Sequence, residues 1–77
     1  MHSEQRLNLL GRITVNSEQC GGRPCIRGMR IRVIDVLSLL SVSLSANQVL
    51  QELPDLDEDD LRACMLYAAR ALGGEVQ

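Results

Sequence analysis

Apolar and polar residues alternate with two different periods along this chain, and the change of period separates its first part from the rest. Aliphatic and polar side chains alternate over residues 12–15, and this period of two predicts a short strand with one apolar face. Residues 16–22 contain Asn, Ser and a Gly-Gly pair, which are typical of a loop. Residues 24–26 and 29–33 then flank Arg27-Gly28, where a glycine that accepts positive φ favours a tight bend or small hairpin.

After this segment the period changes to that of a helix. Apolar side chains recur with the i, i+3, i+4, i+7 spacing of one helix face and predict a first helix over residues 34–40. These side chains are Val33, Val36, Leu37 and Leu40. A second helix is predicted to start after Ser45, which forms a capping box with Gln48. It should end near Leu53, because Pro54 disfavours helical geometry in the residue before it.

The third predicted helix has an acidic start. Asp57 is its N-cap, and the three acids that follow place negative charge at the positive end of the helix dipole. Its apolar stripe consists of Leu61, Met65, Ala68 and Leu72. Gly73 fits the C′ position, where a helix commonly ends in a left-handed residue.

These elements predict one mainly helical domain over residues 1–77, with an N-terminal arm (1–9), a β and loop segment (10–33) and three helices (34–73). Three short helices joined by tight turns resemble a helix-turn-helix cluster. A 77-residue chain buries only about 60% of the surface that it exposes when unfolded. Because 45% of the residues are hydrophobic, we expect apolar surface to be hidden in a homodimer or against a partner.

The charge is divided between the same two parts of the chain. Residues 1–33 hold six arginines and two acids, a balance of +4, whereas residues 34–77 hold two arginines and eight acids, a balance of −6. This division suggests that the two halves contact different partners. Lysine is absent, so every basic side chain other than histidine is a planar guanidinium suited to carboxylate or phosphate.

The composition gives little support to catalysis or metal binding. The single histidine, His2, lies near the terminus, and Cys20 and Cys25 do not have a usual zinc spacing, so we expect no enzyme activity, metal or cofactor. The sequence contains no secretory signal and no apolar run long enough to cross a membrane. We therefore expect a cytoplasmic protein in which Cys20, Cys25 and Cys64 are reduced thiols.

Positive charge is concentrated in residues 22–33, GRPCIRGMRIRV, which hold four arginines and no acid. The candidate binding residues of this segment are Arg23, Arg27, Gly28, Arg30 and Arg32. They could contact the phosphates of DNA, the carboxylates of an acidic protein, or acids of this chain. In the last case, Arg30 or Arg32 would pair with Asp35 or with an acid of the third helix. The start of that helix is unsuited to reading DNA, because phosphates would repel its four acids.

Two stretches of the sequence resemble a bacterial family. RITVNSEQCGGRPCIRGMRIRV, a short helix and LSANQVLQELPDLDEDDLRACMLYAA are similar to the pattern of the domain of unknown function 433 family, over about residues 10–69. The chain departs from that pattern at Met29, Arg32 and Ser43, where Thr, Pro and Gly are usual. The resemblance implies a small cytoplasmic protein related to homeodomain-like helix-turn-helix domains. It also implies an antitoxin that is encoded beside a PIN-like ribonuclease.

The leading hypothesis is therefore an antitoxin-like binding module. It would dimerise through aliphatic surface and contact a PIN-like toxin through the arginines of residues 22–33. The alternatives are a regulator that binds operator DNA with the same arginines and a structural subunit with no nucleic-acid contact.

Overall fold

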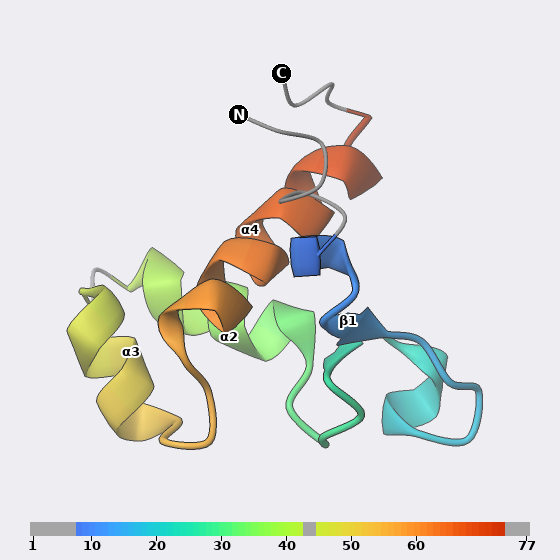
Figure 1. Ribbon diagram of the computed structural model, residues 1–77, viewed down its shortest axis with the longest axis horizontal. Helices are drawn as coiled ribbons and strands as arrows, with labels where there is room; N and C mark the ends of the chain where they lie inside the picture. Colours follow the sequence, from blue (N-terminus) through green and yellow to red (C-terminus); the bar gives the residue numbers. More distant parts are fainter. Residues whose placement is uncertain (1–7, 43–44, 74–77) are drawn as a thin grey trace.

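The computed structural model describes residues 8–42 and 45–73 (Figure 1). The chain is mainly helical, with a short antiparallel pair of strands on its N-terminal side, as predicted. In chain order the elements are β1 (Ile13–Thr14), a 3-10 helix η1 (Cys20–Gly22), β2 (Cys25–Ile26), α2 (Val33–Ser41), α3 (Ala46–Glu52) and α4 (Glu58–Ala71). Residues 8–10 are also helical. Most of the predicted arm and position 43 lie outside the described residues.

β1 and β2 form a very short antiparallel ribbon. Ile13 lies opposite Ile26, and Thr14 lies opposite Cys25. The strand predicted over residues 12–15 is thus confirmed, although it is shorter by one residue at each end. Its partner comes from the segment that follows the long loop.

The bend predicted after β2 is also confirmed. The backbone N–H of Met29 donates to the carbonyl oxygen of Ile26 at 2.8 Å and closes a four-residue turn. Arg27 and Gly28 at its centre have φ values of 48° and 72°, the left-handed pair that a type I′ turn requires. A single backbone bridge closes the small hairpin around this turn.

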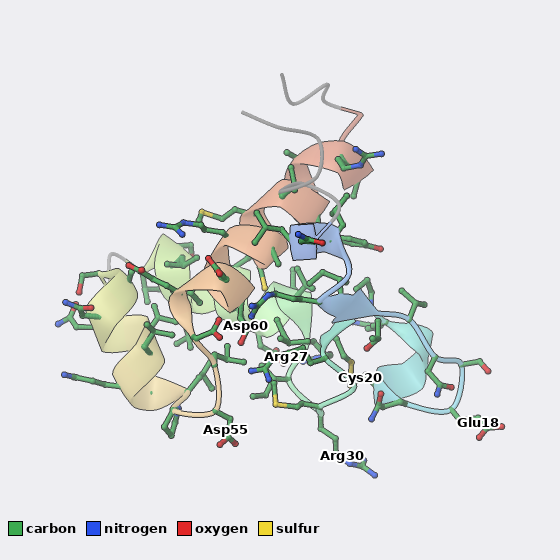
Figure 2. The ribbon with its side chains drawn as sticks, in the orientation of Figure 1. Glu18, Cys20, Arg27, Arg30, Asp55 and Asp60 are labelled. Carbon is green, nitrogen blue, oxygen red and sulfur yellow. A yellow bond between two sulfur atoms is a disulfide. The ribbon has the colours of Figure 1, made fainter. Side chains whose placement is uncertain are left out.

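The loop between β1 and β2 is closed by a disulfide. η1 brings Cys20 across from Cys25, and their sulfur atoms are joined (Figure 2), with the two Cα atoms 7.0 Å apart. The expectation of three reduced thiols is therefore wrong for this pair. The spacing of the two cysteines along the chain does not reveal that the loop folds back on itself. Cys64 is a free and buried thiol.

The helix termini follow the predicted capping residues. Ser45 and Gln48 exchange hydrogen bonds at the start of α3, and Asp57 and Asp60 do the same at the start of α4. Gly73 follows α4 with a φ of 85°, the left-handed geometry expected of a C′ glycine. Both predicted starts and the end of the last helix are thus confirmed.

The core lies where the three helices meet the strand ribbon. Its buried members are Ile26, Val33, Val36, Val49, Leu56, Leu61 and Cys64. Of the stripe predicted for α4, Leu61 is the member that belongs to this core, whereas Met65 is 49% exposed and Leu72 is 88% exposed. The inward side of α4 instead includes the carboxylate of Asp60, which a stripe drawn through apolar residues omits.

Helix α4 connects the two parts of the chain. It contacts α2, α3 and β1, and Figure 1 shows its last turns extending away from both α3 and β1. This placement brings the acidic start of α4 within reach of side chains from the N-terminal part. No helix among the described residues is long and apolar enough to span a membrane.

Candidate functional site

The structure separates the candidate residues of the arginine segment (residues 22–33) into two groups. Arg27 and Arg32 form ion pairs with carboxylates of this chain. Among residues 8–42 and 45–73, no ion pair involves Arg23 or Arg30. Gly28 has a conformational role, because it supplies the second left-handed residue of the turn.

Arg27 extends from the turn after β2 to the start of α4. Its Nε donates to Oδ1 of Asp60 at 3.1 Å, and its Nη2 donates to Oδ2 at 2.7 Å. Nη2 also donates to the carbonyl oxygen of Asp55 at 2.9 Å. Figure 2 shows Arg27 and Asp60 close together between α4 and the turn. A bidentate pairing of this kind is stronger and more directional than a single hydrogen bond.

Arg12 is not among the candidate residues, yet it binds the same carboxylate. Its Nη1 donates to Oδ1 of Asp60 at 2.9 Å and to the carboxylate of Asp57 at 2.9 and 3.2 Å. The carboxylate of Asp59 lies 3.8 Å from Nη2 of Arg12. We call Arg12, Arg27 and Asp60 the Arg–Asp cluster. It joins the strand ribbon, the turn and the last helix.

Asp60 is fully buried, and its charge is compensated by this cluster. Burial alone would raise the pKa of its carboxyl. The hydrogen bonds from Arg27, from the backbone N–H of Asp57 and from Arg12 outweigh burial and hold the pKa below its ordinary value. Because an unpaired buried carboxylate would be strongly destabilising, the two arginines make this inward position possible.

The periodicity of α4 contains a signal for this arrangement. Asp60, Cys64 and Tyr67 recur at i, i+4 and i+7 and therefore lie along one side of the helix. Cys64 is buried and Tyr67 packs against the core, so the acid shares an inward face. Arg12 and Arg27 of the positive half bind Asp60 of the acidic half, so the division of charge also serves contacts within the chain. The positive half pairs with the acidic half of the same molecule.

Arg32 stabilises the start of α2. Its Nε and Nη2 donate to the two carboxylate oxygens of Asp35 at 3.1 and 2.8 Å, and its backbone N–H donates to Oδ2 at 3.2 Å. The side-chain hydrogen bonds from Arg32 lower the pKa of Asp35. The predicted pairing of Arg32 with Asp35 is confirmed. The predicted contact with an acid of the last helix is made by Arg27 rather than by Arg30 or Arg32.

Arg30 and Arg23 are the exposed arginines of the segment that form no ion pair with the described residues. The side chain of Arg30 points away from the body of the protein in Figure 2. The turn before it is fixed on two sides, since the N–H of Gly28 donates to Oγ1 of Thr14 at 3.0 Å and Arg27 is bound to α4. Arg30 is therefore an exposed guanidinium on a well-anchored backbone.

A second surface feature is an apolar groove between α2 and α4, with a volume of about 370 Å³. Its apolar lining includes Ile34, Leu37, Tyr67, Ala68, Ala71 and Leu72. Arg23 and Pro24 also belong to the lining. An adjoining hollow shares Tyr67 and Ala71 with the groove and includes Arg70. Apolar surface bordered by arginine is suited to binding another polypeptide.

The buried thiol of Cys64 is a poor nucleophile. Burial, followed by the nearby charge of Asp60, raises the pKa of Cys64 to about 12, so its thiol stays protonated at neutral pH. Within the described part of the chain, no group of three or more His, Cys, Asp or Glu side chains is arranged to hold a metal ion.

These features define a class of small helical domain in which an N-terminal strand ribbon is joined to the last helix by a buried Arg–Asp cluster. The chain belongs to the family of proteins of unknown function designated DUF433, whose family model matches residues 13–68. The matched region includes Arg27 and Asp60, and Arg12 immediately precedes it.

A curated relative is the uncharacterized protein y4eO of Sinorhizobium fredii (strain NBRC 101917 / NGR234). It is 32% identical over 56 residues, which make up 73% of this chain and 25% of the relative. The chain therefore matches only about a quarter of that protein's length. No solved structure matches the chain significantly.

Proposed function

We propose that this chain is an antitoxin-like protein-binding module that neutralises a PIN-like ribonuclease. The observation that carries the proposal is the exposed Arg30 directly after a turn that Arg27 attaches to α4. A group held on a fixed backbone loses less conformational entropy on binding, and arginine is enriched among the residues that dominate protein interfaces. The carboxylates that bind metal in such a nuclease would form a pocket of matching charge.

The same geometry weakens the DNA-binding alternative. Arg27 and Arg32 already bind carboxylates of this chain, which leaves Arg23 and Arg30 as the segment's available arginines for phosphates. Two phosphate contacts give only a small electrostatic contribution to affinity. The first turn of α4 adds three acids, which phosphates would repel. The contact with a protein is therefore better supported than the contact with an operator.

The proposal is tested with the product of the gene adjacent to this one. That protein expressed alone should inhibit growth, and co-expression of this chain should restore growth and allow the two to be purified together. Arg30→Glu should abolish both effects without changing the thermal midpoint, because no described carboxylate pairs with Arg30. Arg62→Ala is the matched control, since Arg62 is an exposed arginine whose pair with Asp59 lies at the surface. It should behave like the native chain.

A neighbouring product that neither affects growth nor co-purifies would overturn the proposal. Rescue by Arg30→Glu as strong as that by Arg62→Ala would also contradict it, because the arginine segment would then not be the contact. Binding to duplex DNA at about 50 mM salt that Arg30→Glu abolishes, without any toxin binding, would favour the operator alternative. Arg27 is unsuited to this test, since its loss would affect the fold as well as the surface.

A further inference from the structure

The groove between α2 and α4 gathers exposed apolar side chains that a folded monomer leaves in water. Ile34 is 52% exposed and Leu72 is 88% exposed, and both belong to the groove lining. Scattered apolar residues on a surface need no explanation, but a contiguous group at a hollow is typical of a binding site. The groove lies between two helices, which is a common place for such sites.

The described residues place charge of a single sign at this groove. Arg23 belongs to the groove lining and Arg70 to the adjoining hollow, while no acidic residue of the described part of the chain lines either of these two hollows. Within residues 8–42 and 45–73, neither arginine forms an ion pair. A ligand that complements this surface has an apolar face with carboxylates beside it.

We propose that the groove is the docking site for an amphipathic helix that carries acidic residues beside its apolar face. Such a helix presents side chains at i, i+3, i+4 and i+7, and a row of this kind fits a groove between two helices. A second copy of this chain fits less well. A two-fold contact would place the same patch on both sides and bring Arg23 and Arg70 of the two copies together.

This inference rests on the proposed function in taking the partner to be a protein, and it adds a contact surface separate from Arg30.

The test uses two synthetic helical peptides of about 18 residues, because shorter helices are marginal in water. Both peptides have the same leucine stripe, and the positions beside it are glutamate in one and lysine in the other. The affinity of each for the intact chain is measured by fluorescence anisotropy. The glutamate peptide should bind at least about tenfold more tightly, because only its side chains pair with Arg23 and Arg70.

Variants of the chain locate the binding. Ile34→Glu and Leu72→Glu should each lower the affinity for the glutamate peptide by about tenfold or more, because each puts a carboxylate among apolar groups. Both side chains are largely exposed, and circular dichroism verifies that each variant is folded. Met65→Glu is the matched control, since Met65 is an exposed apolar residue of α4 outside the groove lining. Arg23→Glu should shift the preference toward the lysine peptide.

The proposal is overturned if the chain binds the two peptides with equal affinity or binds neither of them. It is also overturned if Ile34→Glu leaves the affinity for the glutamate peptide unchanged. A dimer in analytical ultracentrifugation that Ile34→Glu and Leu72→Glu dissociate would also overturn it, since the occupant would then be a second copy. The peptide assay contains no ribonuclease, so its failure does not affect the rescue experiment. In the same way, a failed rescue leaves the peptide result standing.

Discussion

Replacing Asp60 by Asn tests the Arg–Asp cluster directly, because the change removes the charge and keeps the shape of the side chain. The native carboxylate accepts hydrogen bonds from Arg12 at 2.9 Å, from Arg27 at 2.7 and 3.1 Å, and from the backbone N–H of Asp57 at 3.0 Å. An asparagine has one acceptor oxygen. Its NH2 group would point its own hydrogens at N–H groups of the arginines or of Asp57, which cannot accept a hydrogen bond. Arg27 therefore loses at least one of its two hydrogen bonds to this side chain, and both arginines lose the neighbouring charge.

The expected loss of stability is large for a chain of this size. Removing one partner of a buried ion pair costs about 3–5 kcal/mol. The side chains of Arg12 and Arg27 are 29% and 43% exposed, so water can compensate part of their loss. The lower end of the range, about 3 kcal/mol, is therefore expected for Asp60→Asn. The total stability of 77 residues is only about 4–12 kcal/mol, and the thermal midpoint should fall by about 15 °C.

Urea unfolding followed by far-ultraviolet circular dichroism measures this loss, since the chain has no tryptophan and Tyr67 is its single aromatic residue. Asp59→Asn is the matched control. Asp59 lies in the same helical turn, but its side chain is 48% exposed, pairs with Arg62 at the surface and lies 3.8 Å from Arg12, too far for a hydrogen bond. It should lose about 0.5 kcal/mol or less. If the two variants lose the same free energy of unfolding, the cluster does not hold the ribbon to the last helix and the reasoning is refuted.

The other predictions concern the acid response, the turn and the buried thiol. The pKa of Asp60 lies below its ordinary value of 3.8 in the folded state. The contribution of this carboxylate to the stability of the fold is therefore fully present above pH 3.8 and is lost as the pH falls through the folded-state pKa. Urea midpoints of the native chain should therefore fall more steeply in acid than those of Asp60→Asn, and equal slopes would contradict this. Gly28→Ala should cost about 1 kcal/mol in urea unfolding, because its φ of +72° disfavours a Cβ atom, and Gly28→Asn should cost less. Cys64, with its pKa raised to about 12, should resist iodoacetamide in the native chain and react in urea, and rapid labelling without urea would contradict its burial.

Local features of this fold could be predicted from the sequence because their causes lie within a few residues. The capping box of α3 depends on Ser45 and Gln48, three positions apart, and the turn after β2 depends on a glycine that tolerates positive φ. The first helix was expected from the spacing of apolar residues, and Val33 and Val36 are indeed buried. No knowledge of the tertiary structure is needed for any of these.

Features that depend on residues distant in the sequence could not be predicted in the same way. Arg12 and Asp60 are 48 positions apart, and their contact requires that β1 pack beside the start of α4. The disulfide between Cys20 and Cys25 depends on the reversal of a loop. In both cases the residue types were visible, but the arrangement in space that brings them together was not.

The arginine segment shows why a count of charges does not define a binding surface. Arg27 and Arg32 each neutralise an acid of this chain, so they contribute little net charge to the surface and instead fix the backbone around them. Arg30 lies between them in the sequence and remains exposed. Its position relative to the protein is therefore set by the neighbours that turn inward. A variant of Arg27 that loses partner binding would report the loss of this support, whereas a variant of Arg30 that is as stable as the native chain would report the contact itself.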